Sequence, residues 1–497
     1  MKTLVIVNNP KNWALQIPGV ELISAKSYLA DPQYSSLKNA RVFNLCRSYR
    51  YQTTGYYVSL LAMARGHKPL PNVLTIQDLK SPTMVRFVSD ELDMLIQKSL
   101  KTIQSDRFTL SIYFGRNIAK RYDRLCHQLF SQFQAPLLRA QFVKNEKWNM
   151  QSIGPIAASD IPEEHHSFMV EKAKEYFKRR RNYISRKEAT RFDLAILINP
   201  EEKFPPSNER ALQKFTKAAE ALDFYVERIT KEDYGRLAEF DALFIRETTN
   251  VNHHTYRFSR KAAVEGLVVI DDPESILRCT NKVYLAELLE RHKIAAPKTK
   301  IVSEENQQRI PNEIGLPCIL KQPDSSFSQG VVKADTPEEL EQALKTLFAK
   351  SDLLIAQEFI PTDFDWRVGI LNHKPLYVCK YFMARKHWQI YERSKTGRTY
   401  EGKAETLSVE EAPAEVIKTA LKAANLIGDG LYGVDLKQVN GKVHVIEVND
   451  NPSIDSGIED GVLKDDLYRE IMTEILRRIE QQKGIRRDTV ESSRSST

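Results

Sequence analysis

The chain has 497 residues, of which 42% are hydrophobic and 28% are charged, values typical of a soluble globular protein with three or four domains of roughly 150 residues each. Its net charge of +8 comes from 73 basic residues spread among 65 acidic ones, so the composition does not indicate a nucleic-acid partner. The first apolar run ends before Asn8 and is too short for a signal peptide or a membrane span. We therefore expect a cytoplasmic protein with no membrane partner, whose five separated cysteines are buried, reduced thiols: Cys46, Cys126, Cys279, Cys318 and Cys379.

Residues 1–150 predict an α/β domain. Strands are expected at 4–7, 20–24 and 41–45, and helical periodicity runs from Tyr56 to Arg65 before it ends at Gly66. Residues 151–190 predict a basic, largely helical bridge. Its run of three arginines, 179–181, either binds an acidic partner or lies on a solvent-exposed helix face.

A regular alternation of strands and helices begins at Phe192. Between this residue and residue 272 the sequence predicts four strands and two helices, a pattern typical of a parallel sheet covered by helices. Further helices and strands continue to about residue 480. Residues 483–497 are polar, and we expect them to be disordered.

Residues 433–455 contain two apolar runs around Asn440-Gly441, which predicts a tight β-hairpin. A strict two-residue loop would place polar side chains opposite apolar ones. One extra residue, either in the loop or in a bulge beside it, sorts the two faces. The pairs expected in that register are Val434 with Val448, Leu436 with Ile446, and Asp435 with Glu447.

The same register places two carboxylates opposite each other. Like charges in this position destabilise a hairpin unless a cation lies between them. Oxygen ligands suit Mg²⁺ or Mn²⁺, so Asp435, Glu447 and Asn449 are candidate metal ligands. A solvent-exposed acidic face is the alternative.

Two further segments are candidates for binding a phosphorylated ligand. Lys321 ends a predicted strand before the loop DSSFSQG, whose backbone N–H groups are able to cover phosphate. An ordinary surface hairpin is the alternative. Residues 357–360 end another strand and offer backbone groups to an adenine edge, while Arg367 suits a transferring phosphoryl group. Asp365 and Arg367 could equally form a surface pair.

In this order along the chain, the elements NK (281–282), QEFI (357–360), DWR (365–367) and EVNDNP (447–452) resemble the ATP-grasp carboxylate–amine ligases, most closely the RimK-like branch. Residues 1–150 resemble the N-terminal domain often fused to RimK-like modules. The resemblance implies an α/β fold with an N-terminal accessory domain (1–150), the bridge (151–190), a parallel-sheet pre-ATP-grasp domain (191–275), and an ATP-grasp core of two α+β subdomains (276–350 and 351–482).

The resemblance also implies roles for particular residues. Arg367 is the expected catalytic residue, and Asp435, Glu447 and Asn449 are the expected ligands of Mg²⁺ or Mn²⁺, with two ions expected. Substrate contacts are expected from Arg246, Arg385 and Arg398. The residues expected to bind ATP are Lys282, Lys321, Ser328, Gln329, Gly330, Gln357, Glu358, Phe359, Ile360, Asp365 and Lys380.

The reaction implied is ATP-dependent formation of an amide bond through an acyl phosphate, with release of ADP and phosphate and with glutamate or another amino acid as a substrate. One alternative is a ligase that extends a polypeptide tail, which the basic stretch at 165–187 favours. Another is an ATP-binding scaffold without catalysis, which the full set of charged residues argues against. The loop DSSFSQG has serines where the family has glycines, so the resemblance does not extend to its mobility. A homo-oligomer is compatible with the resemblance.

Overall fold

The computed structural model describes residues 2–13, 17, 19–37, 40–157, 160–178, 190–324, 330–384, 391–393 and 399–484. The chain divides into two compact units. The first comprises Met1–Asp193 and Glu232–Phe240, and the second comprises Leu194–Lys231 and Asp241–Thr497. Within the described part of the chain, no helix combines the length and the apolar character that crossing a membrane requires. All five cysteines are buried and unpaired, as predicted.

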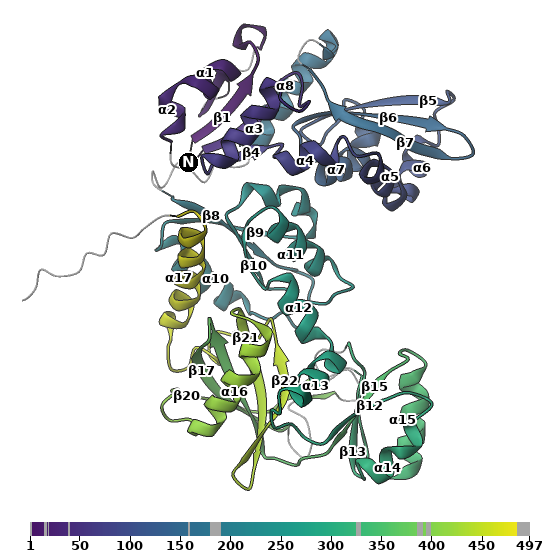
Figure 1. The fold of residues 1–497 in the computed structure, drawn as a ribbon, viewed down its shortest axis with the longest axis vertical. Helices are drawn as coiled ribbons and strands as arrows, with labels where there is room; N and C mark the ends of the chain where they lie inside the picture. The colour runs from purple at the N-terminus through teal and green to yellow at the C-terminus, as the bar shows by residue number, and fades with distance from the viewer. Residues whose placement is uncertain are drawn as a thin grey trace, which may run out of the picture. The chain divides into compact units, whose positions relative to one another are not determined.

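The first unit begins with a four-stranded parallel sheet in the order β2-β1-β3-β4 (Figure 1). The strands expected at 4–7, 20–24 and 41–45 and the helix expected to end at Gly66 are confirmed to within a few residues. The elements are β1 (Lys2–Val7), β2 (Val20–Ser24), α1 (Ala25–Ala30), α2 (Pro32–Ser35), β3 (Ala40–Asn44), α3 (Thr54–Ala64), β4 (Lys68–Leu70) and α4 (Val73–Asp78), with the short helix η1 at Pro10–Asn12.

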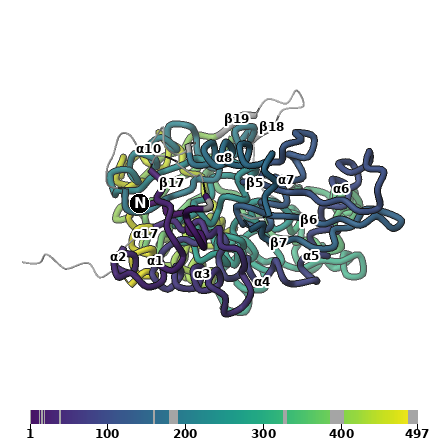
Figure 2. The backbone as a smooth tube through the Cα atoms, turned by 90° about the horizontal axis from the view of Figure 1, so that it is seen from above, coloured from purple at the N-terminus to yellow at the C-terminus, as the bar shows by residue number. Residues whose placement is uncertain are grey.

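A three-stranded antiparallel sheet, β5-β6-β7, follows in the same unit. Its strands lie side by side in Figure 1, and Figure 2 shows the backbone from above. Strand β7 spans Trp148–Pro155, so the domain boundary expected at 150 falls inside a strand. The bridge is helical over α8 (Glu163–Lys178), and the arginine run at 179–181 lies outside the described residues. The other elements are α5 (Pro82–Glu91), α6 (Asp93–Leu100), β5 (Arg107–Tyr113), η2 (Lys120–Tyr122), α7 (Asp123–Gln132) and β6 (Leu137–Lys144).

The second unit contains the predicted parallel sheet, in the order β11-β10-β8-β9, with β10 parallel to both β8 and β11. The carboxy-terminal helix α17 (Asp465–Gln482) packs on α10, where the rings of Phe215 and Tyr468 lie 4.7 Å apart. The remaining elements of this part are β8 (Phe192–Leu197), α10 (Glu209–Glu220), β9 (Phe224–Ile229), β10 (Ala242–Ile245), α11 (His254–Val264), β11 (Val268–Ile270) and α12 (Pro273–Thr280). The helix η4 (Lys231–Glu239) lies between β9 and β10 in sequence, but from Glu232 onward it belongs to the first unit.

The next sheet of the second unit has the order β12-β15-β13-β14, and all its neighbouring strands are antiparallel. Leu340, Leu344 and Leu347 of α15 pack on its apolar face. Strand β15 therefore belongs to this sheet, although the expected boundary at 350 assigned it to the following subdomain. The elements are α13 (Lys282–Arg291), β12 (Thr299–Val302), η5 (Gln307–Arg309), α14 (Ile310–Glu313), β13 (Cys318–Lys321), β14 (Val331–Ala334), α15 (Pro337–Phe348) and β15 (Leu354–Glu358).

A five-stranded antiparallel sheet, β20-β17-β16-β21-β22, completes the second unit. Helix α16 packs on it through small and apolar side chains, including Val416, Ala420 and Ala424. The tail from residue 485 lies outside the described residues. The elements are β16 (Phe364–Leu371), β17 (Lys374–Phe382), β18 (Tyr391–Arg393), β19 (Thr399–Glu401), β20 (Ala404–Leu407), α16 (Ala414–Ile427), β21 (Leu431–Val439) and β22 (Lys442–Asn449).

Candidate active site

A cavity of about 470 Å³ lies within the second unit and is lined by residues of both antiparallel sheets and by the loop after β10. Most of the predicted site residues line it. They are Lys282, Lys321, Gly330, Gln357, Glu358, Phe359, Ile360, Asp365, Arg367, Asp435, Glu447 and Asn449. The structure thus gathers residues that lie up to 167 positions apart in the chain, 282 to 449, around one space.

The hairpin β21–β22 carries the predicted carboxylates in the predicted pairing. Asp435 lies opposite Glu447 and Val434 lies opposite Val448. The expected pairing of Leu436 with Ile446 is wrong, because Leu436 pairs with Val445 and the register shifts next to Asp435.

The reason for that error is the turn. Asn440 and Gly441 both have positive φ, 50° and 77°, and form a strict two-residue loop flanked by the pair Val439 and Lys442. The extra residue is therefore in a bulge beside the carboxylates and not beside the turn. As a result Ile446 and Glu447, although adjacent in sequence, both line the cavity.

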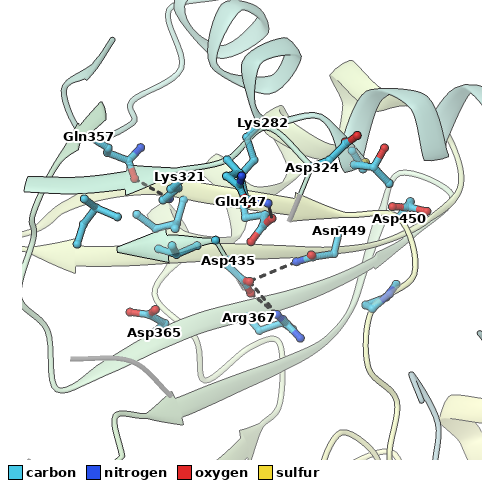
Figure 3. Close-up of a pocket in the computed structure, with 18 of the residues that line it drawn as sticks. Lys282, Lys321, Asp324, Gln357, Asp365, Arg367, Asp435, Glu447, Asn449 and Asp450 are labelled. Carbon is cyan, nitrogen blue, oxygen red and sulfur yellow. Dashed lines mark hydrogen bonds and ion pairs between the residues drawn. The ribbon is translucent and has the colours of Figure 1, made fainter. Parts of the chain in front are cut away.

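The two carboxylates are each paired with a cation of the protein itself (Figure 3). Arg367 donates from Nε to Asp435 Oδ1 at 2.6 Å and from Nη2 to Oδ2 at 2.7 Å. Lys282 Nζ lies 2.8 Å from Glu447 Oε1. The expected repulsion between the carboxylates is thus offset before any metal binds, which the sequence argument did not foresee.

These ion pairs decide the charge states. Burial alone would raise the pKa of Glu447, but the ammonium group of Lys282 outweighs burial and the pKa lies below its ordinary value. Burial alone would lower the pKa of Arg367, whereas Asp435 raises it well above the ordinary value. Glu447 and Arg367 are therefore both charged at neutral pH.

Lys321 lies at the end of β13, where the sequence placed it. Its Nζ donates to Gln357 Oε1 at 2.8 Å, and Gln357 Nε2 donates to Thr299 Oγ1 at 2.9 Å, which fixes the amide. Burial, together with the nearby Lys282, lowers the pKa of Lys321 to about 8. The loop after Lys321 closes through a hydrogen bond from Gln322 N to Gly330 O, 2.9 Å long. Ser328 and Gln329 lie outside the described residues.

Residues 357–360 extend from the end of β15 along the cavity. Glu358 N is bonded to Lys298 O at 2.9 Å, and the Lys333 ammonium group lies 4.5 Å from the centroid of the Phe359 ring. Asp365 lines the same cavity from β16.

Lys437 was not among the predicted site residues, yet it lines the cavity and its Nζ contacts Asp365 Oδ1 at 2.6 Å. Burial raises the pKa of Asp365, and Lys437 opposes that effect. Lys437 is two positions after Asp435 on β21, and this spacing was the available signal because alternate residues of a strand share a face.

Asp450 is a second cavity residue that was not predicted. It is 4% exposed, lines the cavity, and accepts a hydrogen bond from Thr249 Oγ1 at 2.8 Å. Burial raises the pKa of its carboxyl group to about 7.

Arg246 was expected to contact substrate, but the structure does not place it in the cavity lining. Its side chain is 1% exposed. It donates to Ser207 Oγ at 3.0 Å, Asn451 Oδ1 at 2.7 Å and the carbonyl oxygens of Pro452, at 2.9 Å, and Pro206. Arg246 therefore holds three residues that do line the cavity, Pro206, Asn451 and Pro452.

Lys380 was expected to bind ATP and is also outside the lining. Its Nζ lies 3.8 Å from Glu405 Oε2 and over the rings of Phe364 and Trp366, 5.4 and 5.3 Å from their centroids. Arg385 and Arg398, the other expected substrate contacts, lie outside the described residues.

The donor set on the hairpin fits a hard divalent cation. Asp435 and Glu447 are paired residues, and the Asn449 amide contacts Asp435 Oδ2 at 3.2 Å (Figure 3). All three side chains present oxygen and line one cavity, which is the chemistry that Mg²⁺ and Mn²⁺ prefer.

Comparison with known proteins identifies two domains in the chain. Residues 25–172 match the RimK-like ATPgrasp N-terminal domain, and residues 279–475 match the RimK-like ATP-grasp domain. A probable alpha-L-glutamate ligase of Vibrio atlanticus (strain LGP32) is 28% identical over 233 residues, which cover 46% of this chain and 74% of the relative. The alpha-aminoadipate–LysW ligase LysX of Saccharolobus solfataricus is 27% identical over 219 residues, which cover 42% of this chain and 75% of the relative.

Solved structures with a similar fold include a D-alanine–D-alanine ligase from Bacillus anthracis, at 14% identity and a TM-score of 0.45, covering 59% of this chain and 99% of that one. A RimK domain ATP-grasp protein from Sphaerobacter thermophilus has 16% identity and a TM-score of 0.44, with coverage of 57% and 99%. The two matched domains together account for most of the sequence, and the chain therefore contains a RimK-like ATP-grasp N-terminal domain and a RimK-like ATP-grasp domain.

Proposed function

We propose that the cavity is the active site of an ATP-dependent ligase that joins a carboxylate to an amine, with an amino acid such as glutamate as one substrate. The observation that carries the proposal is the convergence of Lys282, Lys321, Arg367, Asp435 and Glu447 on one cavity. This set supplies both cations for phosphate and carboxylates for a metal ion. The match of residues 279–475 to the RimK-like ATP-grasp domain supports the same reaction class.

In this proposal ATP lies between the two antiparallel sheets. Lys282 and Lys321 face its phosphates, the backbone near Gly330 covers them, and the backbone of residues 358–360 faces the adenine edge. Asp365 is suited to the ribose hydroxyls. Gln357 contributes by holding the ammonium group of Lys321 through the 2.8 Å hydrogen bond.

Asp435, Glu447 and Asn449 would hold the metal ions, for which we propose Mg²⁺ or Mn²⁺ and a pair of ions. When bound, such ions neutralise charge on the phosphate oxygens. Arg367 is already fixed by its two hydrogen bonds to Asp435, so its guanidinium group is ordered for the transferring phosphoryl group.

The reaction follows in two steps. A carboxylate oxygen of the first substrate attacks the γ-phosphorus of ATP, and the bond to the bridging oxygen breaks, which gives an acyl phosphate and ADP. The amine nitrogen of the second substrate then attacks the acyl carbon, phosphate leaves with the former carboxylate oxygen, and the nitrogen loses a proton. The charges that develop in the first step lie on phosphoryl oxygens, where Lys282, Lys321 and Arg367 would stabilise them.

The substrate class is supported by two relatives, a probable alpha-L-glutamate ligase and an alpha-aminoadipate–LysW ligase. For the domains we propose that residues 191–275 form the pre-ATP-grasp domain and that the two antiparallel sheets are the ATP-grasp subdomains, with β15 assigned to the first of them because of its pairing with β12 and β13. The protein is proposed to act in the cytoplasm.

The test is release of ADP from ATP with amino acids supplied in pairs, followed by mass spectrometry of the products. Wild type should form ADP and a product that carries an amide bond, and only when both a carboxylate and an amine are present. Arg367→Ala is the matched variant, expected to bind ATP but to form little product. If no pair gives ADP, and Glu447→Gln binds Mg²⁺ and ATP as tightly as wild type, the chain is an ATP-binding scaffold and not a ligase.

A further inference from the structure

A second group of metal-binding side chains lies outside the cavity lining, in the segment between β10 and α11. Glu247 follows β10, and His253 and His254 begin α11. Each of the three side chains offers one possible ligand atom, and these three atoms lie within 4.8 Å of one another. Among the described residues, this is the group of histidine and carboxylate side chains that is close enough to share a metal ion. None of the three lines the ligase cavity.

The carboxylate of Glu247 is buried, and only one of its two oxygens has a hydrogen-bond partner among the described residues. The residue is 2% exposed, and His254 Nε2 lies 2.8 Å from its Oε2. Its Oε1 is buried and has no hydrogen-bond partner among the described residues. An unpartnered oxygen on a buried carboxylate is costly, so a hydrogen-bonded Glu–His pair does not by itself account for the arrangement.

The two histidines complete a set of ligands that a metal ion would use. Their rings lie 3.9 Å apart between centroids, and both side chains are partly exposed, so an ion has access from solvent. The Nδ1 of His253 is 3.1 Å from Thr255 Oγ1. Such a partner on one ring nitrogen orients the ring and directs the other nitrogen to a ligand, as is usual for metal-bound histidines.

We propose that Glu247, His253 and His254 bind one divalent transition-metal ion of the Zn²⁺ type. Two imidazole nitrogens and one carboxylate oxygen are ligands that Zn²⁺ accepts, with a fourth position left for water. The same donors are poorly suited to Mg²⁺, which prefers oxygen alone. This site is thus chemically distinct from the oxygen set of Asp435, Glu447 and Asn449.

The ion would have a structural consequence for the cavity. It would join residue 247 to residues 253 and 254 and so close the intervening loop, of which Thr248, Thr249 and Asn250 line the ligase cavity. The backbone oxygen of Glu247 also accepts a hydrogen bond of 2.7 Å from Asn451 Nδ2, and Asn451 lines the cavity as well. The site is therefore placed to hold one wall of the cavity, although the metal binding itself does not depend on the ligase function.

The proposal is tested by metal binding to the full chain after treatment with a chelator. Zn²⁺ is titrated by calorimetry in excess Mg²⁺, which occupies the oxygen site, and Co²⁺ is used as a spectroscopic probe of nitrogen ligands. Wild type should bind one equivalent of Zn²⁺, give a Co²⁺ visible spectrum, and melt at a higher temperature with Zn²⁺ than without it. The variants His253→Gln and His254→Gln should not bind the equivalent of Zn²⁺, should not give the Co²⁺ visible spectrum, and should melt at the same temperature with and without Zn²⁺.

His373→Gln is the matched control, because His373 is an exposed histidine that bonds to Asn425 far from the cluster in sequence; it should bind Zn²⁺ as wild type does. The proposal is overturned if wild type binds no Zn²⁺ in excess Mg²⁺, or if the two histidine variants bind it as tightly as the His373 variant. Unchanged far-ultraviolet circular dichroism shows that the variants fold. If a variant does not fold, the Co²⁺ spectrum of wild type alone decides, since oxygen-only coordination there would contradict the two histidine ligands.

Discussion

The affinity for ATP should fall as the pH rises above about 8, because of Lys321. The pKa of this lysine is about 8 in the free protein, lowered from 10.5 chiefly by burial. Phosphate favours the protonated amine, so ATP binding should raise the pKa and take up a proton. Well below pH 8 the lysine is protonated before ATP binds, so its titration does not change the affinity for ATP. Above pH 8 the affinity for ATP falls by up to about tenfold for each pH unit.

The size of the effect follows from the two pKa values. If bound phosphate restores the ordinary value of 10.5, the difference of 2.5 units from about 8 corresponds to a total loss of affinity of about 300-fold, of which about 80-fold occurs between pH 8 and pH 10.5. The terminal phosphate of ATP titrates at about pH 6 to 7, as other phosphate esters do. Its titration therefore does not change the affinity between pH 8 and pH 10.5.

The assay is calorimetric titration of ATP at constant Mg²⁺ from pH 7 to pH 10, in two buffers with different ionisation enthalpies at pH 8.5 so that proton uptake is measured directly. Lys321→Arg is the control, because a guanidinium group remains charged throughout this range. The reasoning is refuted if wild type shows no proton uptake, or if Lys321→Arg loses affinity with pH as steeply as wild type does.

Three further predictions concern single charged residues. Arg367→Ala should lower kcat by about 10²–10³-fold with a smaller effect on ATP affinity, measured by steady-state kinetics and calorimetry, and an equal loss in both would contradict its role in phosphoryl transfer. Glu447→Gln should weaken the dependence on divalent metal and cost about 1–3 kcal/mol of unfolding free energy at pH 7, because it removes the carboxylate that pairs with Lys282. Since the pKa of Glu447 is lowered in the folded protein, that difference between wild type and variant should shrink as the pH falls below about 4 in urea titrations, and a constant difference would refute it. Arg246→Ala should cost about 3 kcal/mol or more in the same titrations, because four buried acceptors lose their donor, and unchanged stability would show that Arg246 does not hold the loop.

The hairpin shows how far local sequence reasoning extends. Alternation of side chains and the Asn440-Gly441 turn were enough to place Asp435 opposite Glu447. They were not enough to place the bulge, because Val445 and Ile446 are both apolar and either one satisfies the core face next to Leu436. Only the packing of the complete sheet distinguishes the two registers.

The partners of the carboxylates were not predictable from the hairpin alone. Arg367 reaches Asp435 because β16 pairs with β21, a contact between residues 68 positions apart. The sequence placed Arg367 in the site through its resemblance to a family but could not show this pairing. It therefore predicted repulsion where the structure has two ion pairs.

Other differences arise from side-chain burial. Arg246 and Lys380 are basic residues near apolar strands, and the sequence does not show whether such a side chain points to a cavity or into the protein. Arg246 is buried among carbonyl oxygens, and Lys380 lies over aromatic rings. The boundary expected at 350 separates β15 from the sheet that it joins, because the sheet that a strand joins depends on nonlocal pairing.

The central claim is that the chain activates a carboxylate as an acyl phosphate, and isotope transfer tests it most directly. The carboxylate substrate identified in the ADP-release screen is labelled with ¹⁸O in both oxygens and converted to the amide with ATP and the amine. The account predicts that the released inorganic phosphate carries one ¹⁸O atom and that ADP is the nucleotide product. Phosphate without label, or AMP that carries the label, would contradict the acyl phosphate and with it the proposed roles of Arg367, Asp435 and Glu447.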